Sequence, residues 1–170
     1  MAGEFSTAGI KLYYVIADVP ASEKSNPPTS GFTRIPGVKA IGSFNDAPDM
    51  LEVTDLSDTR RRYIPGLQSG GDAKTITANG SKKGATTGFE TAWNTLVSSY
   101  NEDVGVKSGT KTAFFEVEIP NHDSYFFTGA PIALDLNGVE VGNVYEIEAY
   151  VAVDYKLGFH PATEKTISNI

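Results

Sequence analysis

The stretch VYEIEAYVAV, residues Val144–Val153, alternates over ten positions. One set of positions is apolar (Tyr145, Ile147, Ala149, Val151 and Val153), and the set between them begins with two carboxylates (Glu146, Glu148, Tyr150 and Ala152). Because a β-strand points successive side chains to opposite faces of its sheet, this segment is expected to bury one face and expose the other. The stretch TAFFEVEI, residues Thr112–Ile119, repeats the alternation. The polar sides of the two segments carry four carboxylates, Glu116, Glu118, Glu146 and Glu148. These segments therefore predict strands with one apolar face and one acidic face.

Short strands are expected on both sides of these segments along the chain. The 17 glycines and nine prolines interrupt the sequence so often that few segments could form long helices. Between the interruptions lie runs rich in β-branched and aromatic residues, the pattern of an all-β sandwich or barrel. Further strands are expected at Ile10–Ile16, Phe32–Ile41 (bent or divided at Pro36-Gly37), Met50–Leu56, Ala73–Ala78, Tyr125–Gly129 and Pro131–Leu136.

One segment, at about residues 88–101, has helical periodicity instead. Its apolar positions recur every three or four residues and share one helix face, namely Phe89, Trp93, Leu96, Val97 and Tyr100. Thr86 or Thr87 is expected to cap the start of the helix, and Glu90 in the first turn suits the helix dipole. The helix is expected to flank the sheet, with Trp93 as a core anchor.

Length and charge limit the remaining possibilities. A chain of 170 residues is expected to form one mainly β domain, with an N-terminal arm over 1–9 and a C-terminal arm over 156–170. The net charge of −7 argues against a protein that reads nucleic-acid sequence, because such proteins need a basic patch. The absence of cysteine excludes disulfides and thiolate metal sites. The sequence has no apolar run near the ~18 residues of a membrane span and no signal-peptide pattern, so membrane binding is not expected.

Catalytic motifs are also missing from the sequence. It contains no GxSxG, no GxxxxGK[ST] phosphate loop and no HExxH. The run GSKKG at Gly80–Gly84 lacks the spacing of a phosphate loop and is expected to be a basic loop. His122 and His160 are the only histidines, so a metal site is not expected. We therefore predict no catalytic, cofactor-binding or metal-binding residues, and no enzymatic activity.

Seven stretches follow one another along the chain: TAGIKLYYVIADVP, IPGVKAIGSF, LEVTDLSDTRRRYIPGL, FETAWNTLVSSY, FFEVEIP, YFFTGAPIAL and VYEIEAYVAV. Taken in this order, they resemble the major tail tube proteins of bacteriophages with long non-contractile tails. Together they cover about Gly9 to Val153, and the blocks LEVTDL…YIPGL and AWNTLV…FFEVEIP carry most of the specificity. The resemblance implies a β-sandwich with one flanking helix, a fold shared with type VI secretion tubes.

The resemblance also implies a function in the virion. Such proteins form hexameric rings that stack into a tube, through which genomic DNA passes during ejection without specific binding. Other tail proteins, such as the tape measure and the terminator, would be partners, and assembly would take place in the host cytoplasm. The segment 43–71 corresponds to the extended loop or hairpin that meets adjacent subunits and the next ring. The family has no catalytic residues to carry over to this chain.

Two hypotheses about named residues follow from the resemblance. A lumen with negative charge would let DNA slide, because basic contacts would bind its phosphates. One acidic face, either Glu116/Glu118 or Glu146/Glu148, is therefore expected to line the lumen, and replacing all four residues with lysine should slow or block DNA passage. The chain also has a basic cluster, which consists of Arg60, Arg61 and Arg62. Together with Tyr63, this cluster is expected to form a ring-to-ring contact.

Other interpretations of the same residues stay open beside these hypotheses. The acidic faces could be solvent-exposed sheet surfaces, and the arginines could belong to a solvated loop that keeps a sheet edge soluble. The eight tyrosines and nine phenylalanines also suit a β-sandwich module that binds carbohydrate or a receptor. Within the resemblance, a tube from a contractile tail or from a phage-derived bacteriocin is a further alternative.

Overall fold

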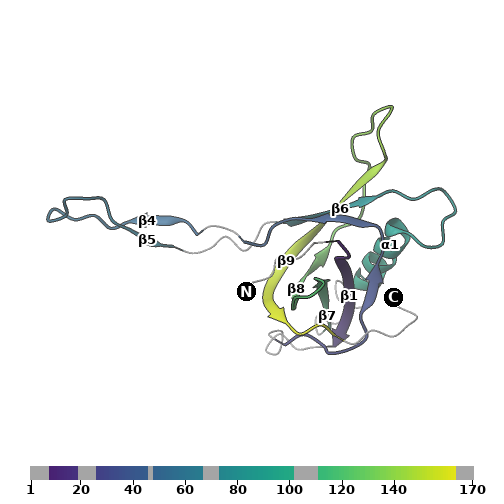
Figure 1. The fold of residues 1–170 in the computed structure, drawn as a ribbon, viewed down its shortest axis with the longest axis horizontal. Helices are drawn as coiled ribbons and strands as arrows, with labels where there is room; N and C mark the ends of the chain where they lie inside the picture. Colours follow the sequence, from purple (N-terminus) through teal and green to yellow (C-terminus); the bar gives the residue numbers. More distant parts are fainter. Residues whose placement is uncertain (1–7, 19–25, 46–47, 67–72, 102–110, 164–170) are drawn as a thin grey trace.

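The computed structural model describes residues 8–18, 26–45, 48–66, 73–101 and 111–163, and within them one seven-stranded antiparallel sheet dominates (Figure 1). The strands lie side by side in the order β2 (Thr33–Ile35), β1 (Lys11–Asp18), β7 (Lys111–Glu118), β8 (Ser124–Pro131), β9 (Glu146–His160), β6 (Ala73–Asn79) and β3 (Val38–Ile41). The strands β4 (Met50–Glu52) and β5 (Tyr63–Pro65) pair separately as a hairpin, and α1 spans Phe89–Tyr100.

The two edge strands of the large sheet are neighbours in the sequence. Strand β2 ends at Ile35 and β3 begins at Val38, so only Pro36-Gly37 connects opposite edges. Because three Cα–Cα steps span at most about 11 Å, the edges must approach each other and the sheet must curl. Gly37 has a φ of 78°, which side chains rarely adopt, and its carbonyl accepts a hydrogen bond from the backbone N–H of Asn79 at 3.1 Å. The mainly β sandwich or barrel expectation is confirmed.

The main core lies between the inner face of the curled sheet and α1. Phe89, Trp93 and Leu96 of the helix are buried there, and Val97 and Tyr100 pack against the same cluster. The sheet contributes buried side chains that include Leu12, Phe115, Val117, Phe127, Ile147 and Val151. The indole Nε1 of Trp93 donates to the carbonyl oxygen of Ile132 at 2.8 Å, which joins the helix to the end of β8. The predicted core face of the helix is therefore confirmed.

The opposite face of β1, β7 and β8 carries a second, smaller apolar cluster. Tyr13, Phe32, Phe114 and Phe126 are buried in it, and Leu157 packs against it. The rings of Phe32 and Phe126 meet edge to face, with 5.9 Å between their centroids. Both faces of β7 are consequently covered, although the sequence predicts an apolar face and an exposed face for this strand.

Several predicted boundaries are wrong. The strand expected to end at Val153 continues to His160, because bulges opposite Phe126–Phe127 and Thr128–Gly129 let β9 bend and keep pairing with β8 after the alternation ends. The C-terminal arm expected from residue 156 therefore does not include 156–160. Residues 1–7 and 164–170 of the expected arms lie outside the described residues.

Three local expectations also need correction. The strand expected over Pro131–Leu136 ends at Pro131, and the strand expected over Met50–Leu56 ends at Glu52. The helix is capped by Gly88 without a side-chain hydrogen bond, so neither Thr86 nor Thr87 caps it. The carboxylate of Glu90 instead accepts a hydrogen bond from the backbone N–H of Ser81 at 3.0 Å.

Candidate assembly interface

The β4–β5 hairpin projects from the curled sheet as an arm, which we define as residues 48–66 (Figure 1). Its strands pair Met50 with Pro65 and Glu52 with Tyr63. One further backbone hydrogen bond, from the N–H of Val53 to the carbonyl oxygen of Arg62 at 2.9 Å, continues this pairing toward the tip. Six large apolar side chains of the arm are exposed, namely Met50, Leu51, Val53, Leu56, Tyr63 and Ile64. The side chain of Leu56 is fully exposed and that of Leu51 is 54% exposed. A two-stranded hairpin is marginally stable alone, so this arm has the composition of a surface that another molecule covers.

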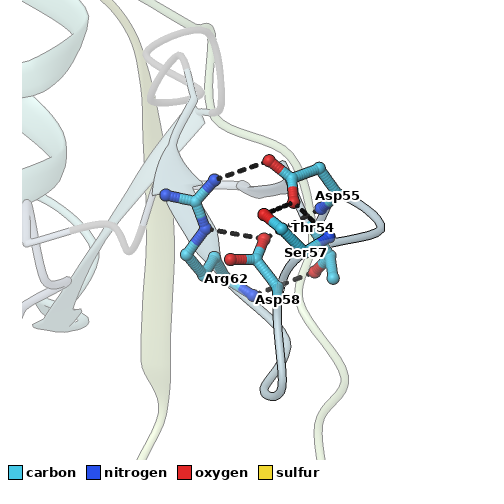
Figure 2. Close-up of polar contacts among 5 residues, drawn as sticks. All are labelled: Thr54, Asp55, Ser57, Asp58 and Arg62. Atoms are coloured by element: carbon cyan, nitrogen blue, oxygen red, sulfur yellow. Dashed lines mark hydrogen bonds and ion pairs between the residues drawn. The ribbon is translucent and has the colours of Figure 1, made fainter.

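The tip of the arm is held by a polar network around Arg62 (Figure 2). The guanidinium Nε of Arg62 donates to the Asp58 carboxylate at 2.9 Å, and its Nη2 lies 3.8 Å from the Asp55 carboxylate. The backbone N–H of Arg62 donates to the Thr54 hydroxyl at 2.9 Å. The Asp55 carboxylate also accepts hydrogen bonds from the backbone N–H and the hydroxyl of Ser57. These hydrogen bonds hold the pKa of Asp55 below its ordinary value.

The three arginines of the basic cluster consequently differ in role. Arg62 satisfies carboxylates of its own arm. Arg61 lies 4.0 Å from the Glu52 carboxylate with both side chains at least half exposed, which makes a weak pair. Arg60 pairs with no carboxylate among the described residues. The structure thus leaves Arg60 and Arg61, together with exposed Tyr63, as the surface groups of the predicted ring-to-ring contact.

The first predicted acidic face does not exist on the single chain. Glu116 is fully buried between Tyr13 and Phe126, its cross-strand neighbours in β1 and β8. Its carboxylate accepts hydrogen bonds from the hydroxyl of Thr163 at 2.6 Å and from the backbone N–H of Thr163 at 3.2 Å. The expectation of an exposed Glu116 is wrong because the segment after β9 returns across this face. Glu118, two residues further along, is half-buried.

The second predicted acidic face is on the surface. Glu146 and Glu148 lie on the outer face of β9, where Glu146 forms an ion pair with Lys39 of β3. The exposed Glu148 accepts a hydrogen bond from the Tyr150 hydroxyl at 3.0 Å, which raises the pKa of Tyr150. Thr77 of β6 lies opposite Glu148 in the sheet. This face therefore combines carboxylates with small hydroxyl side chains.

Sequence reasoning missed a second exposed apolar segment, the β8–β9 connection over Ile132–Tyr145. Five of its large aliphatic side chains are exposed, namely Ile132, Leu136, Val139, Val141 and Val144. A strand is expected over its first part, Pro131–Leu136, but the pairing between β8 and β9 stops at Pro131. The exposure follows from the absence of a neighbouring strand, which the local sequence does not encode.

The two histidines lie against aromatic rings in the described structure. The ring of His122 contacts Phe159, and the ring of His160 contacts Phe126. Within residues 8–18, 26–45, 48–66, 73–101 and 111–163, no group of three or more His, Asp or Glu side chains could hold a metal ion. Over the same residues, no helix has the length and apolar character to cross a membrane.

Comparison with known proteins adds information on the fold. No protein-family model matches the chain, and no curated protein matches its sequence. The chain is similar to one in the tail of an empty gene transfer agent particle with C6 symmetry, with a TM-score of 0.49, 20% identity and 89% and 93% of the two chains covered. It is also similar to one in the virion of a native gene transfer agent particle, with a TM-score of 0.47, 21% identity and coverage of 76% and 88%. A chain of the six-fold symmetrised anti-feeding prophage (AFP) baseplate aligns over 92% of this chain and 94% of its own, with a TM-score of 0.51 and 6% identity, which shows a shared fold.

Proposed function

We propose that the protein is a structural component of a phage-like tail that assembles as stacked hexameric rings into a tube. The fold shared with a chain of the six-fold symmetrised anti-feeding prophage baseplate supports this proposal. The proposed role is structural and has no catalytic step. Genomic DNA would pass through the tube, and other tail proteins would meet its ends.

The observation that carries the proposal is the arm. Its exposed apolar side chains have no covering partner among the described residues of the chain, whereas the helix and the sheet bury most of theirs, with Tyr150, Tyr155 and Phe159 of β9 as exposed exceptions. Exposed apolar patches on otherwise well-packed proteins mark interaction sites. A long arm on a curled sheet gives each copy a means of reaching a neighbour, which stacked rings require.

The outer face of β6 and β9 is our proposal for the lumen surface. Thr75 and Thr77 of β6 lie opposite Tyr150 and Glu148 of β9, so the face carries hydroxyls and carboxylates. Lys39 of β3, a basic group beside this face, is paired with Glu146. A surface of this kind offers a DNA backbone no strong counterion, so DNA would slide without being held.

Electron microscopy of the purified protein tests the proposed function. We expect hollow filaments or stacked rings with six-fold symmetry at high protein concentration. The variant Leu51→Ser/Ile64→Ser, which removes apolar side chains from the arm, is expected to remain folded and to lose these assemblies. The matched control Asn94→Ser/Thr95→Ser changes exposed positions of α1 and should assemble normally. A wild-type protein that stays monomeric at all concentrations would contradict the proposal and favour a binding module.

The lumen proposal has a separate test. Assembled tubes of the variant Glu146→Lys/Glu148→Lys are expected to retain double-stranded DNA at low salt, because basic side chains would then face the phosphates. Wild-type tubes should release it. Equal release of DNA by both kinds of tube would contradict the placement of this face in the lumen.

A further inference from the structure

The β8–β9 connection borders an open groove of about 1050 Å³. Its apolar lining comes from the connection and from the start of β9, and includes Leu136, Val139, Val144 and Tyr145. Val139 is 61% exposed and Val144 is 75% exposed, so the chain itself fills the groove poorly. A groove with this much uncovered aliphatic surface fits an apolar occupant.

The charge of the groove restricts the occupant further. Asp135 and Glu140 lie on the connection, and Glu146 and Glu148 lie where the groove meets the sheet. The lining contains no lysine, arginine or histidine. Asp135 accepts a hydrogen bond from the backbone N–H of Leu136 at 2.7 Å, and Glu140 accepts one from the Asn143 amide at 3.3 Å. Neither of these two loop carboxylates pairs with a basic side chain of the described chain, so the groove suits a partner that is both apolar and cationic.

The tip of the arm has that combination of side chains. Leu56 is fully exposed at the tip, and Tyr63 of β5, which pairs with Glu52, is 48% exposed. Arg60 pairs with no carboxylate among the described residues, and Arg61 makes only the weak, exposed 4.0 Å pair with Glu52, whereas Arg62 is held by Asp55 and Asp58. Two loop carboxylates in the groove match two available arginines on the arm.

We propose that the groove at Asp135 and Glu140 of one copy receives the Arg60–Arg61 tip of a second copy's arm. This inference rests on the proposed assembly and names the surface that the arm contacts. The arm and the β8–β9 connection leave the body in different directions (Figure 1), so the contact joins two copies rather than one. Such a contact joins two different surfaces, and repeating it generates closed rings or open filaments. Glu148 is left on the sheet face that we propose for the lumen.

Charge reversal tests the pairing. The variants Arg60→Glu/Arg61→Glu and Asp135→Lys/Glu140→Lys should each raise the concentration needed for assembly by about tenfold or more, as measured by sedimentation. The chain with all four changes restores opposite charges and should assemble close to the wild-type concentration. The control Lys82→Glu/Lys83→Glu reverses two exposed charges on another loop and should have little effect. Normal assembly of Asp135→Lys/Glu140→Lys, or failure of the fourfold variant to recover, would overturn the inference.

Cross-linking separates this inference from the proposed function. The chain has no cysteine, so Arg61→Cys and Val139→Cys can be made in two separate preparations and mixed with a short bismaleimide. We expect cross-linked dimers from the mixture and none when Asn94→Cys replaces Val139→Cys. Cross-links without tubes would refute the tube and retain the contact, whereas tubes without cross-links would refute the contact and retain the tube. A mixture at high concentration with neither product would overturn both.

Discussion

The body of the molecule, which is the curled sheet together with α1, differs from the arm in how it exposes similar apolar side chains. Trp93 and Phe127 in the body are completely buried, whereas Leu51 and Leu56 in the arm are exposed. The body therefore gains its stability from its own chain, because burial of apolar surface is the main favourable term in folding. The arm gains little from the chain and is expected to gain its stability from a neighbour. The contrast separates residues that determine folding from residues that determine assembly, and substitutions can test this separation.

The largest effect is expected in the body, at Trp93. Trp93→Ala removes a fully buried indole and the hydrogen bond from Nε1 to the Ile132 carbonyl. The free energy of unfolding should fall by about 3–5 kcal/mol, since the substitution leaves a large cavity. Denaturant unfolding of the monomer measures this loss. The exposed neighbour Asn94→Ala is the control, and a similar loss in both variants would contradict the role of Trp93 as the core anchor.

A smaller effect is expected at Glu116, where a polar group is buried in the body. Glu116→Ala leaves the hydroxyl and the backbone N–H of Thr163 without their acceptor. The expected cost is about 1–3 kcal/mol, the usual penalty for an unsatisfied buried group. Thermal unfolding measures it, and faster amide exchange at Thr163 should accompany it. Thr163→Val, which removes only the hydroxyl, should cost less. Unchanged exchange at Thr163 in Glu116→Ala would contradict the link between this residue and the segment after β9.

The arm should show almost no effect on folding. Leu51→Ser/Ile64→Ser changes exposed side chains, so the monomer's free energy of unfolding should stay within about 0.5 kcal/mol of wild type. Assembly should fail in the same variant. Calorimetry of the monomer and electron microscopy of concentrated protein measure the two properties. A destabilised monomer would show that the arm belongs to the folding unit, which would remove the contrast between the two regions.

The sequence predicts the body better than the surfaces. Periodicity identifies the helix and its core residues because Phe89, Trp93 and Leu96 face the same side whatever they pack against. It fails for Glu116, since alternation within a strand cannot reveal that Thr163 covers the strand's second face. It also cannot distinguish Arg62 from Arg60, because their different roles depend on Asp55 and Asp58 across the hairpin turn. Contacts distant in sequence decide which charges remain available.

The smallest expected effect concerns Asp55 at the tip of the arm. Its pKa is lowered in the folded arm, chiefly by the hydrogen bond from the Ser57 hydroxyl. A lowered folded pKa stabilises the tip above the ordinary pKa of aspartate, and this contribution is lost as the pH falls through the folded value. NMR titration of the carboxyl group should give a value below that of a free aspartate, and Ser57→Ala should raise it. The stability of the body should not follow this titration, because the arm folds with little support from the sheet. A coupled change in the body's unfolding temperature over the same pH range would instead indicate that the arm and the body form one cooperative unit.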